Sequence, residues 1–216
     1  AFFRDEHDLG RSTRNPWLRV PTPNVPAARP RALSPDEVKR LLVAADNSGA
    51  YAFRNRTLVV LALRTGLRES EIVRLKIDQY DPDRQQLVAV RRSKTRKLQD
   101  VYIVNQAEQQ LQSWIRFGRG GTNTGPLFRS NKVSHAGHMR PDTLSRMFGG
   151  LFKAAGVEGS GHAFRHTFLT DMANAGTPIH VVQRAAGHAS LASTQQYVRG
   201  TDADVLQALH GLEPIG

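Results

Sequence analysis

The sequence contains no cysteine and no long apolar run. Without cysteine, a disulfide framework, a thiolate zinc site and a cysteine nucleophile are excluded, and the composition fits a reducing cytosol. No segment approaches the ~18 consecutive apolar residues that a membrane-spanning helix needs, and the first residues do not follow the pattern of a signal peptide. We therefore expect a cytoplasmic protein that has no membrane partner.

Acidic residues are also scarce. The 19 Asp and Glu residues face 30 Lys and Arg residues, which gives a net charge of +11 and a pI near 10.8. This balance favours a polyanionic partner, and nucleic acid before a membrane surface. At 216 residues, the chain is long enough for one sizeable core and a fragment of a second domain.

Proline and glycine punctuate the chain into four parts. The first part lacks an initial methionine and carries Phe2, Phe3 and Leu9 among charges, as the end of a helix from a largely missing N-terminal domain would. Five prolines among arginines then predict a semi-rigid extended linker, and a capping box with proline at the first helical position opens the main domain. The predicted parts are a tail (1–13), a linker (14–33), a main domain (34–202) and a C-terminal helix and tail (203–216).

Most of the main domain has the apolar spacing of amphipathic helices. One region differs: Asp81-Pro82-Asp83 predicts a turn, and alternating residues from Leu87 to Arg92 and from Val101 to Val104 predict two strands of a β-hairpin. The sequence therefore predicts a mainly α fold with a small antiparallel β-hairpin sheet. The predicted helices begin at Ser34 or span 51–65, 105–117, 141–155, 161–175 and 178–186.

Residues 160–199 place unlike chemical groups at short spacings. Ser160 is a candidate N-cap and Gly176 a candidate end for one helix, on which His162 and Arg165 lie three residues apart and share a face. A cation and an imidazole are thus expected to point together.

The next two elements add a second imidazole and a phenol. Thr177 and Pro178 predict the start of a second helix that Gly187 ends. His188 follows directly, and Ser190 predicts the start of a third short helix that would carry Tyr197. Taken singly, each of these groups is typical of an ordinary packing or surface residue, but together they indicate a site.

This segment resembles the C-terminal signature of the tyrosine recombinase (phage integrase) family, which is a histidine, two residues, an arginine and a histidine, then glycine and histidine, then the tyrosine. An earlier stretch, TGLRESEIVRL, resembles the first arginine motif of that family. The matching residues are His162, Arg165, His166, Gly187, His188 and Tyr197, with Arg68 as the catalytic arginine of the first motif and Glu71 as its supporting acid.

The predicted hairpin tip carries five cations between Arg91 and Lys97. By itself this run is typical of a solvated turn. The resemblance implies that one lysine of the hairpin enters the cleaved site through the minor groove; Lys94 matches best and Lys97 is the alternative. The cations expected to contact DNA are Arg91, Arg92, Arg96, Lys97, Lys132 and Arg140.

The resemblance implies a site-specific recombinase that breaks and rejoins DNA strands through a 3′-phosphotyrosyl intermediate, without metal, ATP or another cofactor. It further implies four protomers on two DNA duplexes, with accessory DNA-bending factors as possible partners, in a nucleoid-associated protein of the bacterial or phage type. The C-terminal helix would pack against a neighbouring protomer or against its own domain. The implied catalytic residues are Arg68, Lys94, His162, Arg165, His188 and Tyr197.

Three other classes remain open. A metallohydrolase would use His162 and His166, one helical turn apart, but Ala163 occupies the position where the HExxH motif needs glutamate. The other candidate metal ligands, His135 and His138, have no carboxylate or cysteine nearby. A non-catalytic DNA-binding protein would use 161–175 and 178–186 as a helix-turn-helix. A type IB topoisomerase shares the cleavage chemistry, but the short spacing from Gly-His to tyrosine favours a recombinase.

Overall fold

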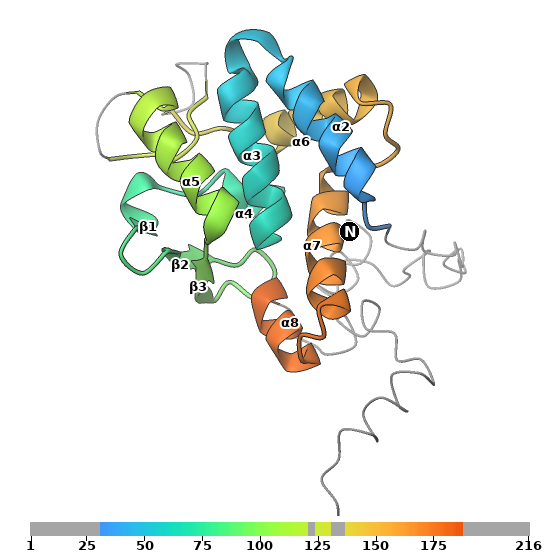
Figure 1. The fold of residues 1–216 in the computed structure, drawn as a ribbon. Coiled ribbons are helices and arrows are strands. Elements are labelled where there is room, and N and C mark those ends of the chain that lie inside the picture. Colours follow the sequence, from blue (N-terminus) through green and yellow to red (C-terminus); the bar gives the residue numbers. More distant parts are fainter. Residues whose placement is uncertain (1–30, 121–123, 131–136, 188–216) are drawn as a thin grey trace, which may run out of the picture.

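The structure is a computed structural model that describes residues 31–120, 124–130 and 137–187. Within these ranges the chain is mainly helical, and one three-stranded antiparallel sheet lies at the side of the helices (Figure 1). The predicted fold class is confirmed.

Helix α2 (Pro35–Asp46) begins at the predicted capping box. The Ser34 amide donates to Glu37 Oε2 at 2.9 Å, and the Glu37 amide donates to Ser34 Oγ at 3.3 Å. Just before the helix, Leu33 is buried and its amide donates to Thr167 Oγ1 at 2.9 Å. The last residue of the predicted linker is therefore part of the packed core.

Helix α3 (Ala52–Thr65) follows a single 3₁₀ turn at Gly49–Tyr51 and runs through the centre of the fold (Figure 1). It packs against α2, α5 and α7, and from Thr57 to Leu63 every side chain is buried. A helix that is apolar on all sides needs partners on all sides. Gly66 ends α3 in the left-handed conformation, with φ +59°.

The sheet has the order β1-β2-β3, with strands Tyr80–Asp81, Gln86–Arg91 and Leu98–Tyr102. The predicted strict alternation in β2 is wrong, because Leu87 pairs with Val101 whereas Val90 pairs with Gln99, so that two residues of β2 oppose one residue of β3. Ala89 adopts φ +52° in this bulge. Leu87 and Val90 consequently both face the core.

Five further α-helices, a 3₁₀ turn at Ile77–Gln79 and a π-helical segment complete the described chain. Trp114, in the π segment, packs between Phe53 and Phe128. Pro178 is the N-cap residue of α8, so this helix begins one residue later than the predicted span 178–186. No helix in the described ranges is long and apolar enough to cross a membrane. The remaining elements are α4 (Glu69–Ile72), α5 (Asn105–Ser113) with its π extension (Trp114–Gly118), α6 (Pro141–Ala154), α7 (Gly161–Asn174) and α8 (Ile179–Ala186).

Helices α7 and α8 share a small core of their own. Leu169 of α7 and Val182 and Ala186 of α8 are fully buried, with Phe168 and Met172 packed beside them. Gly66 leaves room for the Phe168 ring, which lies 2.5 Å from where a Cβ would stand. This contact brings the end of α3 next to α7.

Candidate active site

Arg68 lies at the junction of α3 and α4. It is the N-cap residue of α4, with extended backbone (φ −72°, ψ 152°). Its amide donates to Glu71 Oε2 at 3.1 Å and its Nη1 donates to Glu71 Oε1 at 3.2 Å. About a fifth of the side chain (22%) is exposed. The guanidinium is thus oriented by a neighbouring carboxylate and remains accessible to a ligand.

Glu71 joins Arg68 to the hairpin. Its side chain is completely buried and also accepts from Arg92 Nη1 at 3.2 Å and from the Ser93 amide at 2.8 Å. Burial alone would raise the pKa of Glu71, but the Arg92 charge, the amides of Ser93 and Arg68 and the Arg68 charge outweigh it, so the pKa is lowered. The carboxylate is charged at neutral pH.

Arg92 differs from the sequence prediction. We expected it among the cations that contact DNA, but its side chain is only 1% exposed. Besides Glu71 it bonds the Ala185 carbonyl of α8, with Nη2 donating at 2.6 Å. Arg92 points inward because a buried carboxylate and a helix-terminal carbonyl both need a donor there. A direct DNA contact by Arg92 is therefore not retained.

Arg165 of α7 is buried, and its side chain bonds the C-terminal ends of two other helices, α3 and α8. Its Nη1 donates to the Gly66 carbonyl and its Nη2 to the Ala186 carbonyl, both at 2.6 Å. These carbonyls lie at helix ends, where backbone acceptors lack partners within the helix. The bonds place Arg165 between the loop that leads to Arg68 and the end of α8.

The two hairpin lysines have different surroundings. Lys94 is exposed and follows Ser93, whose amide bonds Glu71 and whose hydroxyl lies 2.6 Å from the Ser70 hydroxyl. Lys97 is also exposed, but it lies at the far end of the turn, where its carbonyl accepts from the Arg92 amide. The residue before Lys94 is thus bonded to Glu71, the carboxylate that orients Arg68, which agrees with the preference for Lys94 without deciding between the two.

His162 lies in the first turn of α7 and is exposed, whereas Arg165, one turn later, is buried. The carboxylate of Glu69 lies against Gly161, with Oε1 2.0 Å from the position that a Cβ would take. This contact brings the start of α7 close to the residue that follows Arg68. Burial, His162 and Arg165 together lower the pKa of the half-buried His166, which favours its neutral form.

Arg68 thus bonds Glu71, and Arg165 bonds the backbone two residues before Arg68. The hairpin joins these residues through the bond from the Ser93 amide to Glu71, and the first turn of α7 joins them through the contact of Gly161 with Glu69. His188, Tyr197 and Lys132 lie outside the described residues, as does His135. Of the cations predicted to contact DNA, Arg91, Arg96, Lys97 and Arg140 are exposed. Arg140 pairs with Asp142, with Nε and Oδ1 3.0 Å apart.

Sequence reasoning missed the contributions of Ser70, Ser93 and Arg92. Serines carry no positional signal in a turn, and Arg92 is one of several adjacent cations. Gly187, which the sequence marked as a helix end and as part of the Gly-His motif, lies so close to Arg92 that a Cβ would stand 2.2 Å from Arg92 Nε.

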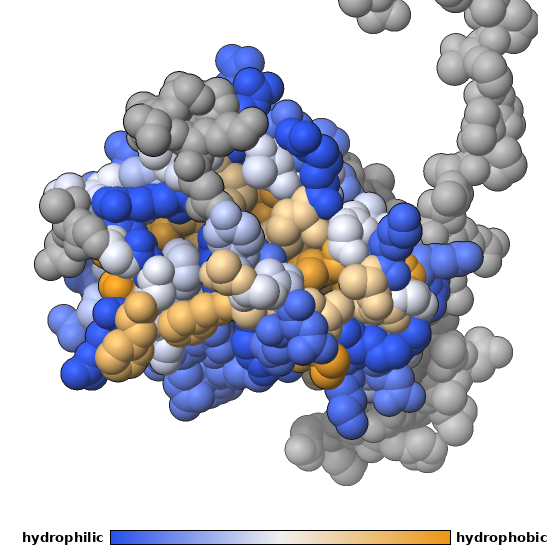
Figure 2. Space-filling model, turned by 90° about the horizontal axis from the view of Figure 1, so that it is seen from above, coloured by the Kyte–Doolittle hydropathy of each residue, from blue (hydrophilic) through white to orange (hydrophobic). Residues whose placement is uncertain are grey.

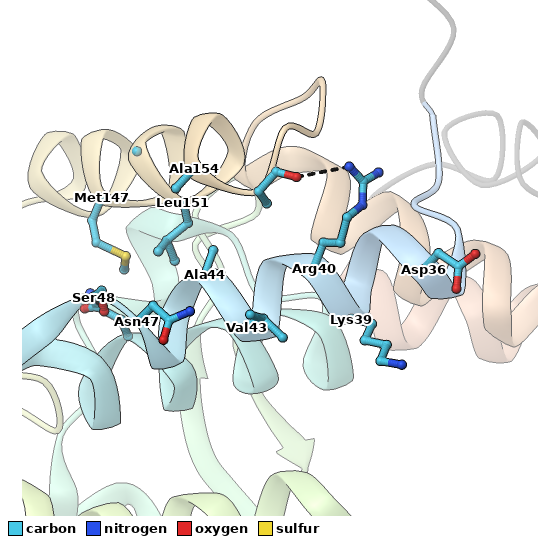
Figure 3. Close-up of a pocket in the computed structure, with 13 residues that line it drawn as sticks. Asp36, Lys39, Arg40, Val43, Ala44, Asn47, Ser48, Met147, Leu151 and Ala154 are labelled. Carbon is cyan, nitrogen blue, oxygen red and sulfur yellow. Dashed lines mark hydrogen bonds between the residues drawn. The ribbon is translucent and has the colours of Figure 1, made fainter.

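A metal site and an apolar groove are the alternatives to a site at Arg68 and Arg165. Nowhere in 31–120, 124–130 and 137–187 do three or more potential metal ligands of the His, Cys, Asp or Glu type gather. A groove of about 890 Å³ lies between α2 and α6, lined by apolar residues such as Val43 and Leu151 (Figure 3). In the view from above, hydrophobic surface is surrounded by hydrophilic surface (Figure 2). The groove contains none of the predicted catalytic residues, so we place the site at the arginines.

Glu71→Gln is expected to lower the free energy of unfolding by about 3 kcal/mol, since breaking a buried ion pair leaves Arg92 without its counter-charge. The pKa of Glu71 is lowered in the folded state. Its contribution is therefore fully present above the unfolded pKa of about 4.3 and is lost as pH falls through the folded pKa. Urea unfolding of both proteins across pH measures this: the difference should be constant near neutrality and shrink in acid.

Asp46→Asn is the matched control, because it removes a partly exposed ion pair in which Asp46 Oδ2 lies 2.5 Å from Arg56 Nη1. That change should cost at most about 1 kcal/mol. Equal losses for the two variants would contradict the structural role of Glu71.

The family model described as the phage integrase family matches residues 31–204. The chain belongs to the phage integrase family. Tyrosine recombinase XerA of Pyrococcus furiosus is 30% identical over 191 residues, which cover 88% of this chain and 65% of the relative. Tyrosine recombinase XerD of Listeria innocua is 25% identical over 218 residues, which cover 97% of this chain and 72% of the relative. The chain thus spans about 65% of the length of XerA.

Solved structures agree with the fold. The crystal structure of XerA recombinase is similar with a TM-score of 0.68 and 31% identity, over 88% of this chain and 68% of that one. The Tn1549 transposon integrase in complex with a circular intermediate DNA has a TM-score of 0.72 at 20% identity, over 98% of this chain and 75% of that one. This second likeness concerns the fold alone.

Proposed function

We propose that this chain carries the catalytic domain of a tyrosine site-specific recombinase, which breaks and rejoins DNA strands through a 3′-phosphotyrosyl intermediate. The catalytic domain covers 34–202. In this proposal, residues 14–33 link the catalytic domain to a preceding domain whose tail is 1–13, and 203–216 follow it as a C-terminal segment. Membership of the phage integrase family and the similarity to recombinases XerA and XerD support the proposal.

One observation carries the proposal furthest. Arg165 bonds Gly66, two residues before Arg68, and also Ala186, two residues before His188. Three segments that the sequence marked separately are thus joined at one guanidinium. A pair of arginines is suited to a DNA phosphate, since each planar guanidinium can bond two phosphate oxygens and stays charged at any working pH.

In the proposed reaction, the phenolic oxygen of Tyr197 attacks the phosphorus of the scissile phosphodiester. A phenol has a reference pKa near ~10, so the attack needs help with removal of its proton. His162 accepts that proton or fixes the phosphate. Arg68 and Arg165 stabilise the charge on the non-bridging oxygens, and His188 donates a hydrogen bond to the same oxygens.

The leaving group is the 5′ oxygen, which takes a proton from Lys94 as its bond to phosphorus breaks. One phosphodiester bond is exchanged for one phosphotyrosyl bond, so no ATP is consumed. The strand is resealed when a 5′ hydroxyl of another strand attacks the phosphotyrosine and the phenol leaves. Cationic side chains supply the charge stabilisation for which many nucleases use a metal ion.

The proposed partners are double-stranded DNA and further copies of the same protein. Four protomers would act on two duplexes, and accessory DNA-bending factors would assist assembly. The net charge of +11 supports a polyanionic partner, and the exposed cations of the hairpin, together with Arg140 just before α6, are candidate phosphate contacts. We place the protein in the cytoplasm, associated with the nucleoid.

Covalent trapping on nicked DNA tests this function against a metallohydrolase and against a non-catalytic DNA-binding protein. A recombinase leaves protein attached to DNA through tyrosine, and chelator does not change the yield. A metallohydrolase would release free products and stop in chelator, and a DNA-binding protein would leave no adduct. Absence of an adduct at a substrate that the protein binds would reject the proposal.

Lys94→Ala is expected to cleave ordinary DNA slowly but to recover most of its rate when sulfur replaces the bridging 5′ oxygen. Sulfur is a leaving group that needs no proton, so it makes the general acid unnecessary. Parallel single-turnover rates on the two substrates measure the rescue. Lys97→Ala is the matched control, and rescue of that variant in place of Lys94→Ala would move the acid along the hairpin.

A further inference from the structure

Three successive carbonyls in the last turn of α8 each accept a hydrogen bond from a side chain of another element. The last carbonyls of a helix lack intrahelical partners, and side chains or water usually supply them. Here three different elements do so, each at 2.6 Å. The bonds run from Gln99 Nε2 of β3 to the Arg184 carbonyl, from Arg92 Nη2 to the Ala185 carbonyl, and from Arg165 Nη2 to the Ala186 carbonyl.

Two of these three donors belong to the hairpin, which lies beside α8 (Figure 1). The same hairpin is bonded to the loop of Arg68, since Glu71 accepts from Arg92 Nη1 and from the Ser93 amide. The hairpin therefore bridges the first arginine motif and the end of α8. These are parts of the chain that lie more than a hundred residues apart.

Arg92 is the side chain on which both connections meet. One nitrogen of its guanidinium bonds Glu71 and another bonds Ala185, so the rigid planar group fixes the spacing between them. The group also lies against Gly187, where a Cβ would stand 2.2 Å from Nε and 2.7 Å from Cζ. Glycine at 187 is thus required by the close approach as well as by its φ of +61°.

Stability alone is a weak reason for a buried ion pair at this point. Replacing such a pair by apolar residues of similar volume is often neutral or stabilising, because desolvation of the charges offsets their attraction. What the planar guanidinium supplies in addition is a defined geometry between the two groups that it bonds. That geometry links Arg68, through Glu71, to the point from which the chain continues into His188.

We propose that Arg92 is a positioning residue that holds the Gly187 end of α8 at a fixed distance from Arg68 and from the Lys94 hairpin. The inference rests on the proposed function and deepens it. Arg92 does not touch the DNA; it keeps the arginine motif, the general acid and the Gly187 end of α8 in register.

The test compares Arg92→Gln and Arg92→Lys with the wild type and with Arg84→Gln, which removes one exposed cation from the turn before β2. Nicked-DNA affinity and the single-turnover rate of adduct formation at saturating DNA are measured for each. We expect Arg92→Gln to react about 100-fold more slowly, as a displacement of about 1 Å can cause, at unchanged affinity. Arg92→Lys should stay slow, because an ammonium keeps the charge but lacks the planar fork. Arg84→Gln should match the wild type.

Amide hydrogen exchange of the free proteins gives a readout that needs no activity. In Arg92→Gln, exchange should rise together in 92–99 and 184–187 and stay unchanged in 52–65. If the Arg92 variants do not fold, Gln99→Ala replaces them, because it removes only the neighbouring bond to the Arg184 carbonyl from a half-buried position. Its rate of adduct formation should fall about fivefold, which corresponds to the loss of one ordinary hydrogen bond.

Two results would overturn the inference. One is a normal rate at saturating DNA with weakened affinity, which would make Arg92 a phosphate contact. The other is unchanged exchange at 184–187 in a folded Arg92→Gln variant. If the wild type itself forms no adduct, the proposed function fails, and the exchange data still decide whether Arg92 holds the end of α8.

Discussion

Tyr197→Phe is expected to abolish DNA strand cleavage and to leave DNA binding nearly unchanged. The phenolic oxygen is the atom that bonds to phosphorus in the proposed reaction, so no other part of the side chain can replace it. Loss of one hydroxyl leaves the charge of +11 and the basic surface as they were. Detergent-resistant adducts on nicked DNA measure cleavage, and gel shifts at fixed salt measure binding.

Tyr102→Phe is the matched control, because it removes the same hydroxyl from an exposed residue of β3. It should form adducts as the wild type does. Tyr80 is a poorer candidate nucleophile, since burial and Glu108 raise its pKa although Gln112 acts in the opposite direction. An adduct formed by Tyr197→Phe would show that the nucleophile is misassigned.

Arg165→Lys is expected to slow adduct formation by roughly 100-fold or more, the usual effect of losing a preorganised donor to a developing charge. It should also lower the free energy of unfolding by about 2 kcal/mol, because one ammonium cannot bond Gly66 and Ala186 together and leaves a buried carbonyl without its donor. Single-turnover trapping measures the rate, and urea unfolding at the assay temperature measures the stability.

Arg56→Lys is the control for this change, since Arg56 lies on α3 in a partly exposed pair with Asp46. Its rate of adduct formation should stay within about twofold of the wild type, and its free energy of unfolding within about 1 kcal/mol. If Arg165→Lys lost stability but cleaved at the normal rate, Arg165 would be a structural residue only.

Much of the fold was predictable because its signals are local. The capping box at Ser34 and the glycines after α3 and α8 mark helix ends through backbone geometry that few other residues provide. The helix junction at Arg68 follows from one of these glycines. Family resemblance then assigned roles to residues that periodicity alone could only place.

What the sequence did not predict depends on contacts between distant segments. Arg92 stands among five cations in a turn, and nothing in that run distinguishes the one that turns inward to Glu71 and Ala185. The bulge at Ala89 likewise depends on a distant partner, because the Ala89 amide donates to the Asp100 carboxylate across the hairpin at 2.9 Å. In both cases the partner is fixed only when the chain has folded.

The most direct measurement of the central claim is the identity of the residue that carries the DNA. Wild-type protein is trapped on a nicked duplex, the adduct is digested with protease, and the peptide that retains nucleotide is sequenced by mass spectrometry. The account predicts a single attachment through the Tyr197 oxygen to a 3′ phosphate, with a free 5′ hydroxyl on the released strand. Attachment at another residue, a 5′ phosphate on the released strand, or cleavage without attachment would contradict it.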